Sequence, residues 1–143
     1  MRILILCTGN SCRSQMAQGI LSSLDSRLEV FSAGTSPGQE VHPFAIRAMN
    51  ELGIDISMYR PKAVGLFLDK AFDYLITVCD DAKENCPVFS GRVSHRLHLG
   101  FDDPAAVTGS PAFILAEFRR VRDEIKNQLD SFYLQTIRKG LQP

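Results

Sequence analysis

The stretch that most restricts the fold lies near the start of the chain, where an apolar run ends in a cysteine and a short polar loop. Residues 4–15 read LILCTGNSCRSQ. The run up to Leu6 is typical of a buried β-strand, and the sequence after Arg13 predicts a helix with Met16 and Ile20 on one face. A strand, a glycine-containing loop and a helix in succession are how an α/β domain begins.

The alternation of strands and helices continues along the chain. Three further strands are predicted by apolar runs at 28–31, 74–78 and 93–99. Stripes of apolar residues predict a helix with Pro43 in its first turn and a long helix capped by Ser110. The sequence therefore predicts an α/β three-layer sandwich with a small, mostly parallel four-stranded sheet flanked by helices. We expect one domain over residues 1–143, because no linker interrupts the pattern.

Composition argues against several classes of partner. Sixteen basic and sixteen acidic residues cancel, so we expect neither nucleic acid nor a membrane surface as a partner. The apolar run after Arg2 is too short for a signal peptide or a membrane span, which predicts a cytoplasmic protein. In that reducing compartment, the four cysteines are more often catalytic, redox-active or metal-linked than disulfide-bonded.

The loop between Cys7 and Arg13 has the composition of an anion-binding site. Its backbone N–H groups can converge at the N-terminus of the following helix. Gly9 and Asn10 tolerate the backbone angles that such a tight loop requires. Arg13 supplies a planar fork that can hold two oxygens of a tetrahedral oxyanion. We expect the helix dipole and Arg13 to lower the pKa of Cys7, which makes this residue the candidate nucleophile.

The side chains and backbone of the whole loop are expected to contribute to oxyanion binding. The candidate oxyanion-binding residues are Thr8, Gly9, Asn10, Ser11, Cys12, Arg13 and Ser14. Ser14 could donate a hydrogen bond to the Cys7 sulfur. A lone cysteine beside a capping turn is usually a core residue, and this description suits Cys12 better than Cys7. Cys12 is therefore interpreted as a packing residue or a bystander thiol.

A second pair of cysteines, Cys79 and Cys86, follows the predicted strand at 74–78. Because the carboxyl ends of parallel strands meet at one edge of a sheet, Cys79 is expected near Cys7. A zinc site would need further ligands at short spacing, which the remaining histidines and cysteines do not supply. A redox pair fits better, because disulfide exchange needs an attacking thiolate and a second thiol within reach.

Several segments together give the chain a family resemblance. CTGNSCRS resembles the C-x5-R-S oxyanion loop of the low-molecular-weight protein tyrosine phosphatase superfamily. The chain is more similar to the thioredoxin-coupled arsenate reductases that share this fold, and the similarity covers most of its length. Its most specific segments are YLITVCDDAKENCP at 74–87 and GFDDPA at 100–105.

The resemblance implies an enzyme that reduces arsenate to arsenite through a relay of cysteines. Cys7 attacks arsenate held by Arg13, and Asp103, the residue before a proline, protonates the departing oxygen. Cys79 then attacks Cys7, which expels arsenite and leaves a Cys7–Cys79 disulfide. Cys86 resolves this to a Cys79–Cys86 disulfide, which thioredoxin reduces. No bound cofactor is implied, and arsenate or phosphate is the expected oxyanion.

Two other functions stay open from the residues alone. A low-molecular-weight protein tyrosine phosphatase would use Cys7, Arg13 and Asp103 without the other cysteines, and weak phosphatase activity is expected of either enzyme. A non-catalytic oxyanion or redox sensor would bind without turnover. Ala105 and Ala106 stand where phosphatases typically carry aromatic residues that cover a phosphotyrosine ring, which favours a small inorganic oxyanion.

The resemblance also implies a potassium site near Asn10, to which many members contribute a glutamate at the position of Gln18. Gln18 keeps an oxygen but lacks the negative charge of glutamate, so the sequence leaves open whether this chain binds potassium. No other metal is expected. Arg119, Arg120 and Arg122 are expected to form a solvent-exposed face of the long helix.

Overall fold

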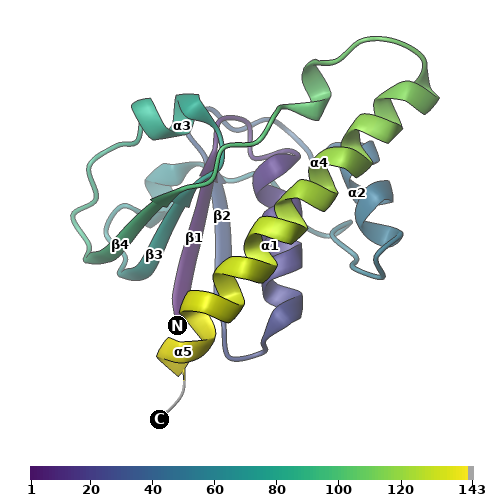
Figure 1. Ribbon diagram of the computed structural model, residues 1–143. Helices are drawn as coiled ribbons and strands as arrows, with labels where there is room; N and C mark the ends of the chain where they lie inside the picture. The colour runs from purple at the N-terminus through teal and green to yellow at the C-terminus, as the bar shows by residue number, and fades with distance from the viewer. Residues whose placement is uncertain (142–143) are drawn as a thin grey trace.

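A parallel sheet forms the centre of the computed structural model, which describes residues 1–141 (Figure 1). Four strands lie in the order β2-β1-β3-β4 and every pairing between them is parallel. Their bounds are β1 (Arg2–Cys7), β2 (Glu29–Gly34), β3 (Phe72–Thr77) and β4 (Val93–His98). This arrangement confirms the α/β fold with a small parallel sheet.

Helices connect the strands and cover the sheet. The α-helices are α1 (Arg13–Leu24), α2 (Pro43–Asn50), α3 (Asp80–Glu84), α4 (Pro111–Phe132) and α5 (Arg138–Leu141). Short 3₁₀ helices η1 (Val64–Phe67) and η2 (Pro104–Ala106) and a π-helical turn η3 (Tyr133–Ile137) complete the chain. As predicted, Ser110 caps α4, since its Oγ accepts a hydrogen bond from the Phe113 N–H at 3.1 Å. Within residues 1–141, no helix combines the length and the apolar character that crossing a membrane requires.

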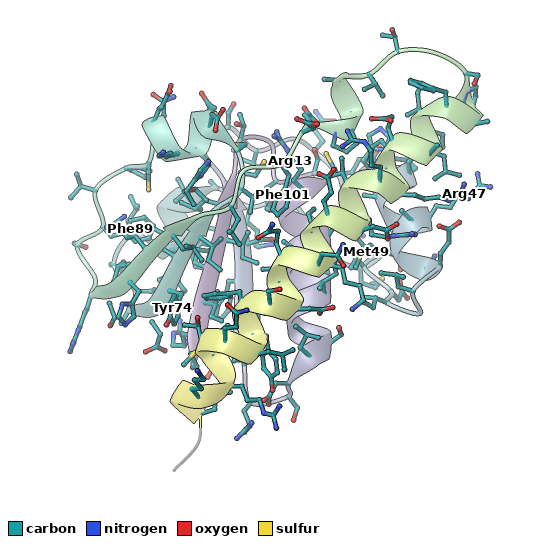
Figure 2. All side chains as sticks on the ribbon, viewed as in Figure 1. Arg13, Arg47, Met49, Tyr74, Phe89 and Phe101 are labelled. Atoms are coloured by element: carbon teal, nitrogen blue, oxygen red, sulfur yellow. The ribbon has the colours of Figure 1, made fainter. Side chains whose placement is uncertain are left out.

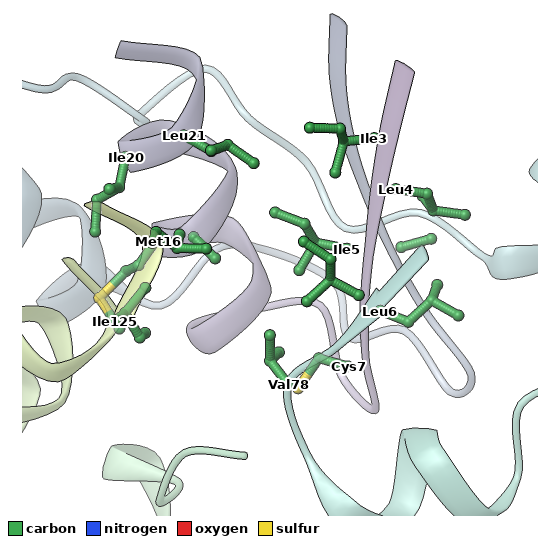
Figure 3. Close-up of a cluster of buried hydrophobic side chains, with 14 of the residues drawn as sticks. Ile3, Leu4, Ile5, Leu6, Cys7, Met16, Ile20, Leu21, Val78 and Ile125 are labelled. Carbon is green, nitrogen blue, oxygen red and sulfur yellow. The ribbon is translucent and has the colours of Figure 1, made fainter. Parts of the chain in front are cut away.

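The first strand is the most deeply buried element of the core. Ile3 and Ile5 point toward α1, whereas Leu4 and Leu6 point to the opposite face of the sheet (Figure 3). All four side chains are completely buried. Because each buried aliphatic side chain contributes about 1.5–3 kcal/mol, this strand is a rigid base for the loop that begins at Cys7.

The order of the strands places a ligand site between the ends of β1 and β3. From β1 the chain crosses to β2 on one side, and it later returns to β3 on the other side. Connections that diverge in this way leave a crevice at the carboxyl ends of the strands, where ligands bind in open α/β sheets. Cys7 is the last residue of β1, and Cys79 lies two residues beyond β3.

The prediction of a solvated arginine face on α4 is wrong for Arg122, which is buried, and holds for the exposed side chains of Arg119 and Arg120. Arg119 reaches across to Glu51 beside α2, with Nη2 and Oε2 2.7 Å apart. Arg122 is buried and contacts the same carboxylate at 2.7 Å. Arg120 remains on the helix surface and pairs with Glu124 at 2.8 Å. The difference arises because α4 packs against α2, which spacing within one helix does not reveal.

Candidate active site

The loop from Cys7 to Arg13 turns its carbonyl groups outward. Four of these carbonyls accept hydrogen bonds from the backbone of the segment that follows β2: the pairs are Thr35 to Cys7, Ser36 to Thr8, Gly38 to Gly9 and His42 to Ser11. In a planar trans peptide the N–H points opposite to the C=O. The N–H groups that follow these carbonyls therefore face the interior of the loop, as an anion cradle requires.

A buried asparagine fixes the shape of this cradle. Asn10 adopts the left-handed conformation with φ 51° and is completely buried. Its Oδ1 accepts hydrogen bonds from the Lys62 backbone N–H at 2.9 Å and from Gln15 Nε2 at 3.1 Å. Its Nδ2 donates to Ser14 Oγ at 2.7 Å. Ser14 thus contacts Asn10, and a Ser14–Cys7 hydrogen bond is not found in the part of the chain that the structure describes.

Arg13, in the first turn of α1, holds its guanidinium beside the segment that leads to the predicted acid (Figure 2). Nη1 donates to the Phe101 carbonyl at 3.1 Å, and Nη2 lies 3.7 Å from Asp103 Oδ2. Nε is buried and has no hydrogen-bond partner among residues 1–141. A buried N–H donor of this kind is costly unless it is paired, so a bound oxyanion is the partner that the geometry offers.

Asp103 lines an open cavity together with Thr8, Arg13 and Cys79. Its backbone is extended, with φ −84° and ψ 106°, as the following Pro104 predicts. Oδ1 accepts from the Ala105 N–H at 3.0 Å, and Cys12 Sγ donates to the same oxygen at 3.7 Å. Burial, and then the Asp103 charge, raise the pKa of Cys12. Cys12 therefore stays protonated and is poorly suited to be the nucleophile.

Cys7 and Cys79 are neighbouring buried thiols at the carboxyl ends of the paired strands β1 and β3. The interaction with Cys79, followed by burial, raises the pKa of Cys7, whereas Arg13 acts to lower it as expected from the sequence. The interaction with Cys7 lowers the pKa of Cys79 to about 5. Arg13 favours the thiolate form of both sulfurs. A negative charge on one of the two sulfurs therefore opposes ionisation of the other.

The start of α3 provides a hydrogen bond to the Cys79 sulfur. Cys79 caps this helix, and its Sγ accepts from the Ala82 N–H at 3.4 Å. The Thr8 hydroxyl lies 3.3 Å from the same sulfur and donates to Asp81 Oδ2 at 2.9 Å. The Ala82 N–H at the helix N-terminus favours a thiolate on Cys79, and Thr8 connects the anion loop directly to α3.

Cys86 is the predicted site residue that the structure does not bring to the pair. It follows α3, and its sulfur contacts the Pro87 carbonyl at 3.6 Å. A helical path of seven residues from Cys79 spans about 10 Å, whereas a disulfide requires Cα atoms about 4.4–6.8 Å apart. All four cysteines are free thiols. Cys86 instead lines a separate cavity of about 240 Å³ beside β3 and β4.

The open cavity of about 510 Å³ brings together four of the predicted site residues: Thr8, Arg13, Cys79 and Asp103. Cys7 is buried at the end of β1, directly before Thr8. A nucleophilic sulfur, a guanidinium and a carboxyl group around one anion-sized opening can perform substitution at a tetrahedral oxyanion.

Comparison with known proteins places the whole chain in one family. The family model described as low molecular weight phosphotyrosine protein phosphatase matches residues 2–142. The chain belongs to this phosphatase family. Its relatives include arsenate reductase 1 of Staphylococcus epidermidis, 45% identical over 131 residues that make up 91% of this chain and 93% of the relative. The arsenate reductase of Bacillus subtilis is 44% identical over the same length and coverage.

Solved structures in the phosphatase family have the same fold. An arsenate reductase in the phosphate binding state superposes with a TM-score of 0.78 at 29% identity, over 94% of this chain and 97% of that one. A low molecular weight protein tyrosine phosphatase from Bacillus subtilis has a TM-score of 0.75 at 22% identity, over 96% and 98% of the two chains. The second likeness shows the fold alone, so fold does not separate phosphatase from reductase.

The amide groups of Asn10 and Gln18, where the family resemblance implies a potassium site, are engaged in hydrogen bonds in this chain. Gln18 Oε1 accepts from Ser32 Oγ at 2.6 Å, and Gln18 Nε2 donates to the Val30 carbonyl at 3.2 Å. The Asn10 oxygen accepts two N–H donors. Asn10 Oδ1 is therefore fully occupied, whereas Gln18 Oε1 accepts one hydrogen bond and has no negative charge to attract a positive ion. Residues 1–141 contain no cluster of three His, Cys, Asp or Glu residues that could hold a metal.

Two acidic residues, Asp80 and Asp81, belong to the site although the sequence did not predict them there. Asp80 and Asp81 form the first turn of α3 and line the cavity. Asp81 contacts Thr8, whereas Asp80 Oδ1 lies 3.2 Å from Nε2 of His98 at the end of β4. Their position directly after Cys79 is the available signal, since acidic residues favour the first turn of a helix.

Proposed function

We propose that the protein reduces arsenate to arsenite through Cys7, Cys79 and Cys86, and that thioredoxin regenerates it. The observation that carries this proposal is the position of Cys79 beside Cys7: Cys79 follows β3, which pairs with β1, and its Sγ lies 3.3 Å from Oγ1 of Thr8, the residue after Cys7. Hydrolysis of a phosphate ester needs one nucleophilic sulfur, an oxyanion clamp and an acid. Hydrolysis does not require a second buried sulfur beside the nucleophile, whereas disulfide exchange does.

In the first step the oxyanion enters the cradle and pairs with the free Nε–H of Arg13. Cys7 passes its proton to the neighbouring Cys79 and attacks arsenic as a thiolate. An S–As bond forms, an As–O bond breaks, and Asp103 donates the proton with which that oxygen leaves as water. The cradle N–H groups and Arg13 stabilise the negative charge on the remaining oxygens.

In the second step Cys79 gives its proton to an oxygen of the adduct and attacks the Cys7 sulfur. A Cys7–Cys79 disulfide forms while the S–As electron pair stays on arsenic, which leaves as arsenite. Cys86 then attacks Cys79, so that a Cys79–Cys86 disulfide forms and Cys7 is released as a thiolate. Two electrons from the thioredoxin dithiol reduce this disulfide. The proton shared by Cys7 and Cys79 lets each sulfur act as a nucleophile in turn.

The last exchange requires α3 to unwind, because the helix keeps Cys86 too far from Cys79 for a disulfide. α3 is short, its residues other than Ala82 are largely exposed, and it ends in a polar turn. Segments with few buried apolar contacts open at low free-energy cost. A relay of free thiols also requires a reducing compartment, which favours the cytoplasm.

Weak hydrolysis of aryl phosphates follows from the same geometry, because Cys7, Arg13 and Asp103 are sufficient for it. Ala105 and Ala106 are exposed and offer no aromatic ring to cover the substrate. We therefore expect poor binding of phosphotyrosine-like esters and preferential use of a small oxyanion.

The test compares Cys79→Ser and Cys86→Ser with the parent in a thioredoxin-coupled arsenate assay and in an aryl-phosphate assay. Both variants are expected to lose arsenate turnover by about a hundredfold or more, because exchange has no alternative thiol. Aryl-phosphate hydrolysis should stay within about threefold of the parent in Cys86→Ser, since Cys86 acts only in the relay, whereas Cys79→Ser should also slow hydrolysis because Cys79 accepts the Cys7 proton in the first step. Cys12→Ser is the matched control and should retain both activities.

Unchanged arsenate turnover in both variants would refute the relay. Loss of aryl-phosphate hydrolysis in Cys86→Ser would contradict the assignment of Cys86 to the relay alone. A parent protein that turns over neither substrate would indicate an oxyanion or redox sensor.

A further inference from the structure

His98 at the end of β4 uses both of its ring nitrogens. Nδ1 lies 2.8 Å from Thr77 Oγ1, and Nε2 lies 3.2 Å from Asp80 Oδ1. A carboxylate can only accept, so the ring must carry a proton on Nε2, and the Thr77 hydroxyl can then donate to Nδ1. A single neutral tautomer satisfies both contacts, and the largely buried Thr77 orients the ring toward α3.

The absence of a side chain at Gly100 leaves room for the contact between His98 and Asp80. A Cβ atom placed on Gly100 would lie 3.1 Å from His98 Nε2 and 3.8 Å from Asp80 Oδ1. A larger residue at that position would press on the ring nitrogen that meets the carboxylate. The absence of a side chain there lets the segment before Asp103 pass close to the His98–Asp80 contact.

The first turn of α3 is therefore tethered on two sides of Cys79. His98 holds Asp80 from the end of β4, and Thr8 holds Asp81 from the anion loop. Asp81 Oδ1 also accepts from Asn85 Nδ2 at 2.8 Å, which links the first turn of α3 to its end. Unwinding of α3 from its start must break these contacts.

We propose that His98 is a positioning residue that latches α3 closed in the reduced protein through Asp80, and that this contact breaks when Cys86 attacks Cys79. The inference rests on the proposed function for its role in the relay. In that exchange the Cys79–Cys86 bond forms, the Cys7–Cys79 bond breaks, and Cys7 leaves as a thiolate. A contact present only in the closed state stabilises that state and opposes the disulfide state.

The experiment is a double-mutant cycle with His98→Ala, Asp80→Asn and the double variant. Asp80 is nearly fully exposed (89%), so its replacement leaves the core intact. His95→Ala is the matched control, because His95 lies on the same strand and stacks on Tyr74 away from α3. Hydrogen exchange at the Lys83 and Asn85 amides reports opening, since both donate within α3.

Each single variant is expected to exchange about tenfold faster at these amides in the reduced protein without arsenate. The equilibrium between the Cys79–Cys86 dithiol and its disulfide should shift about tenfold toward the disulfide, which lowers the reduction potential by about 30 mV. The increase in exchange and the shift in equilibrium should be no larger in the double variant than in either single variant, because both substitutions remove the same His98–Asp80 contact. Aryl-phosphate hydrolysis should not change in His98→Ala, because His98 does not line the active-site cavity.

Additive effects of the two changes, or exchange rates equal to those of His95→Ala, would overturn the latch. Faster exchange without any shift of the dithiol–disulfide equilibrium would also overturn it, because the contact would then not distinguish the two states. Since exchange is measured without arsenate, failure of the parent to reduce arsenate would refute the proposed function and leave this measurement valid.

Discussion

Cys7→Ser should abolish arsenate reduction and aryl-phosphate hydrolysis alike, each by about 10⁴-fold or more, the scale seen when a covalent nucleophile is removed. A serine hydroxyl at the end of β1 would have to ionise in a buried position, and neither the loop N–H groups nor Arg13 offsets that cost. Steady-state rates in both assays measure the loss. A thermal unfolding curve close to that of the parent would show that the variant is folded.

Cys12→Ser provides the matched control for this loss. Cys12 lies in the same loop and is equally buried, yet its thiol contacts Asp103 rather than Cys79. Turnover in this variant should stay within several-fold of the parent. If Cys12→Ser were inactive and Cys7→Ser retained activity, the assignment of the nucleophile would be wrong.

Arg13→Lys should lower kcat/KM for both substrates by about 10²–10³-fold, the cost of removing one preorganised oxyanion donor. A lysine keeps the positive charge but not the planar guanidinium. In Arg13 the two terminal nitrogens contact Phe101 and Asp103, and Nε is left to bind the anion. Inhibition by inorganic phosphate measures the loss independently of turnover, since the inhibition constant should rise.

Arg47→Lys is the control for this substitution. Arg47 is exposed on α2 and lies far from Arg13 (Figure 2). Its replacement should change neither kcat/KM nor phosphate inhibition. A loss of less than tenfold in Arg13→Lys would show that the positive charge alone, rather than the fork geometry, binds the oxyanion.

The fold and the first part of the site could be predicted because they depend on local sequence. Cys7 and Arg13 are separated by a short loop between a strand and a helix, so their proximity follows from spacing. Cys79 could be placed beside them because parallel strands end at one edge of the sheet. Asp103 was identified by its proline neighbour and by family resemblance.

The remaining features depend on packing between elements distant in the chain. The latch between His98 and Asp80 requires the register of β4 on β3, which no periodic pattern specifies. Arg122 becomes buried because α4 meets α2, whereas its helical neighbours alone suggested exposure. The pKa of Cys7 depends on packing as well, since its neighbour Cys79 and burial raise it while Arg13 lowers it.

The relay has one intermediate that phosphatase chemistry never forms, a disulfide between Cys7 and Cys79. In Cys86→Ser this intermediate cannot be resolved, so a single turnover should trap it. The measurement reacts reduced Cys86→Ser with excess arsenate in the absence of reductant, quenches with acid and analyses the disulfide-linked peptides by mass spectrometry. We predict one Cys7–Cys79 disulfide and one arsenite per protein molecule. Free thiols at both positions, or a disulfide between Cys7 and Cys12, would contradict the account.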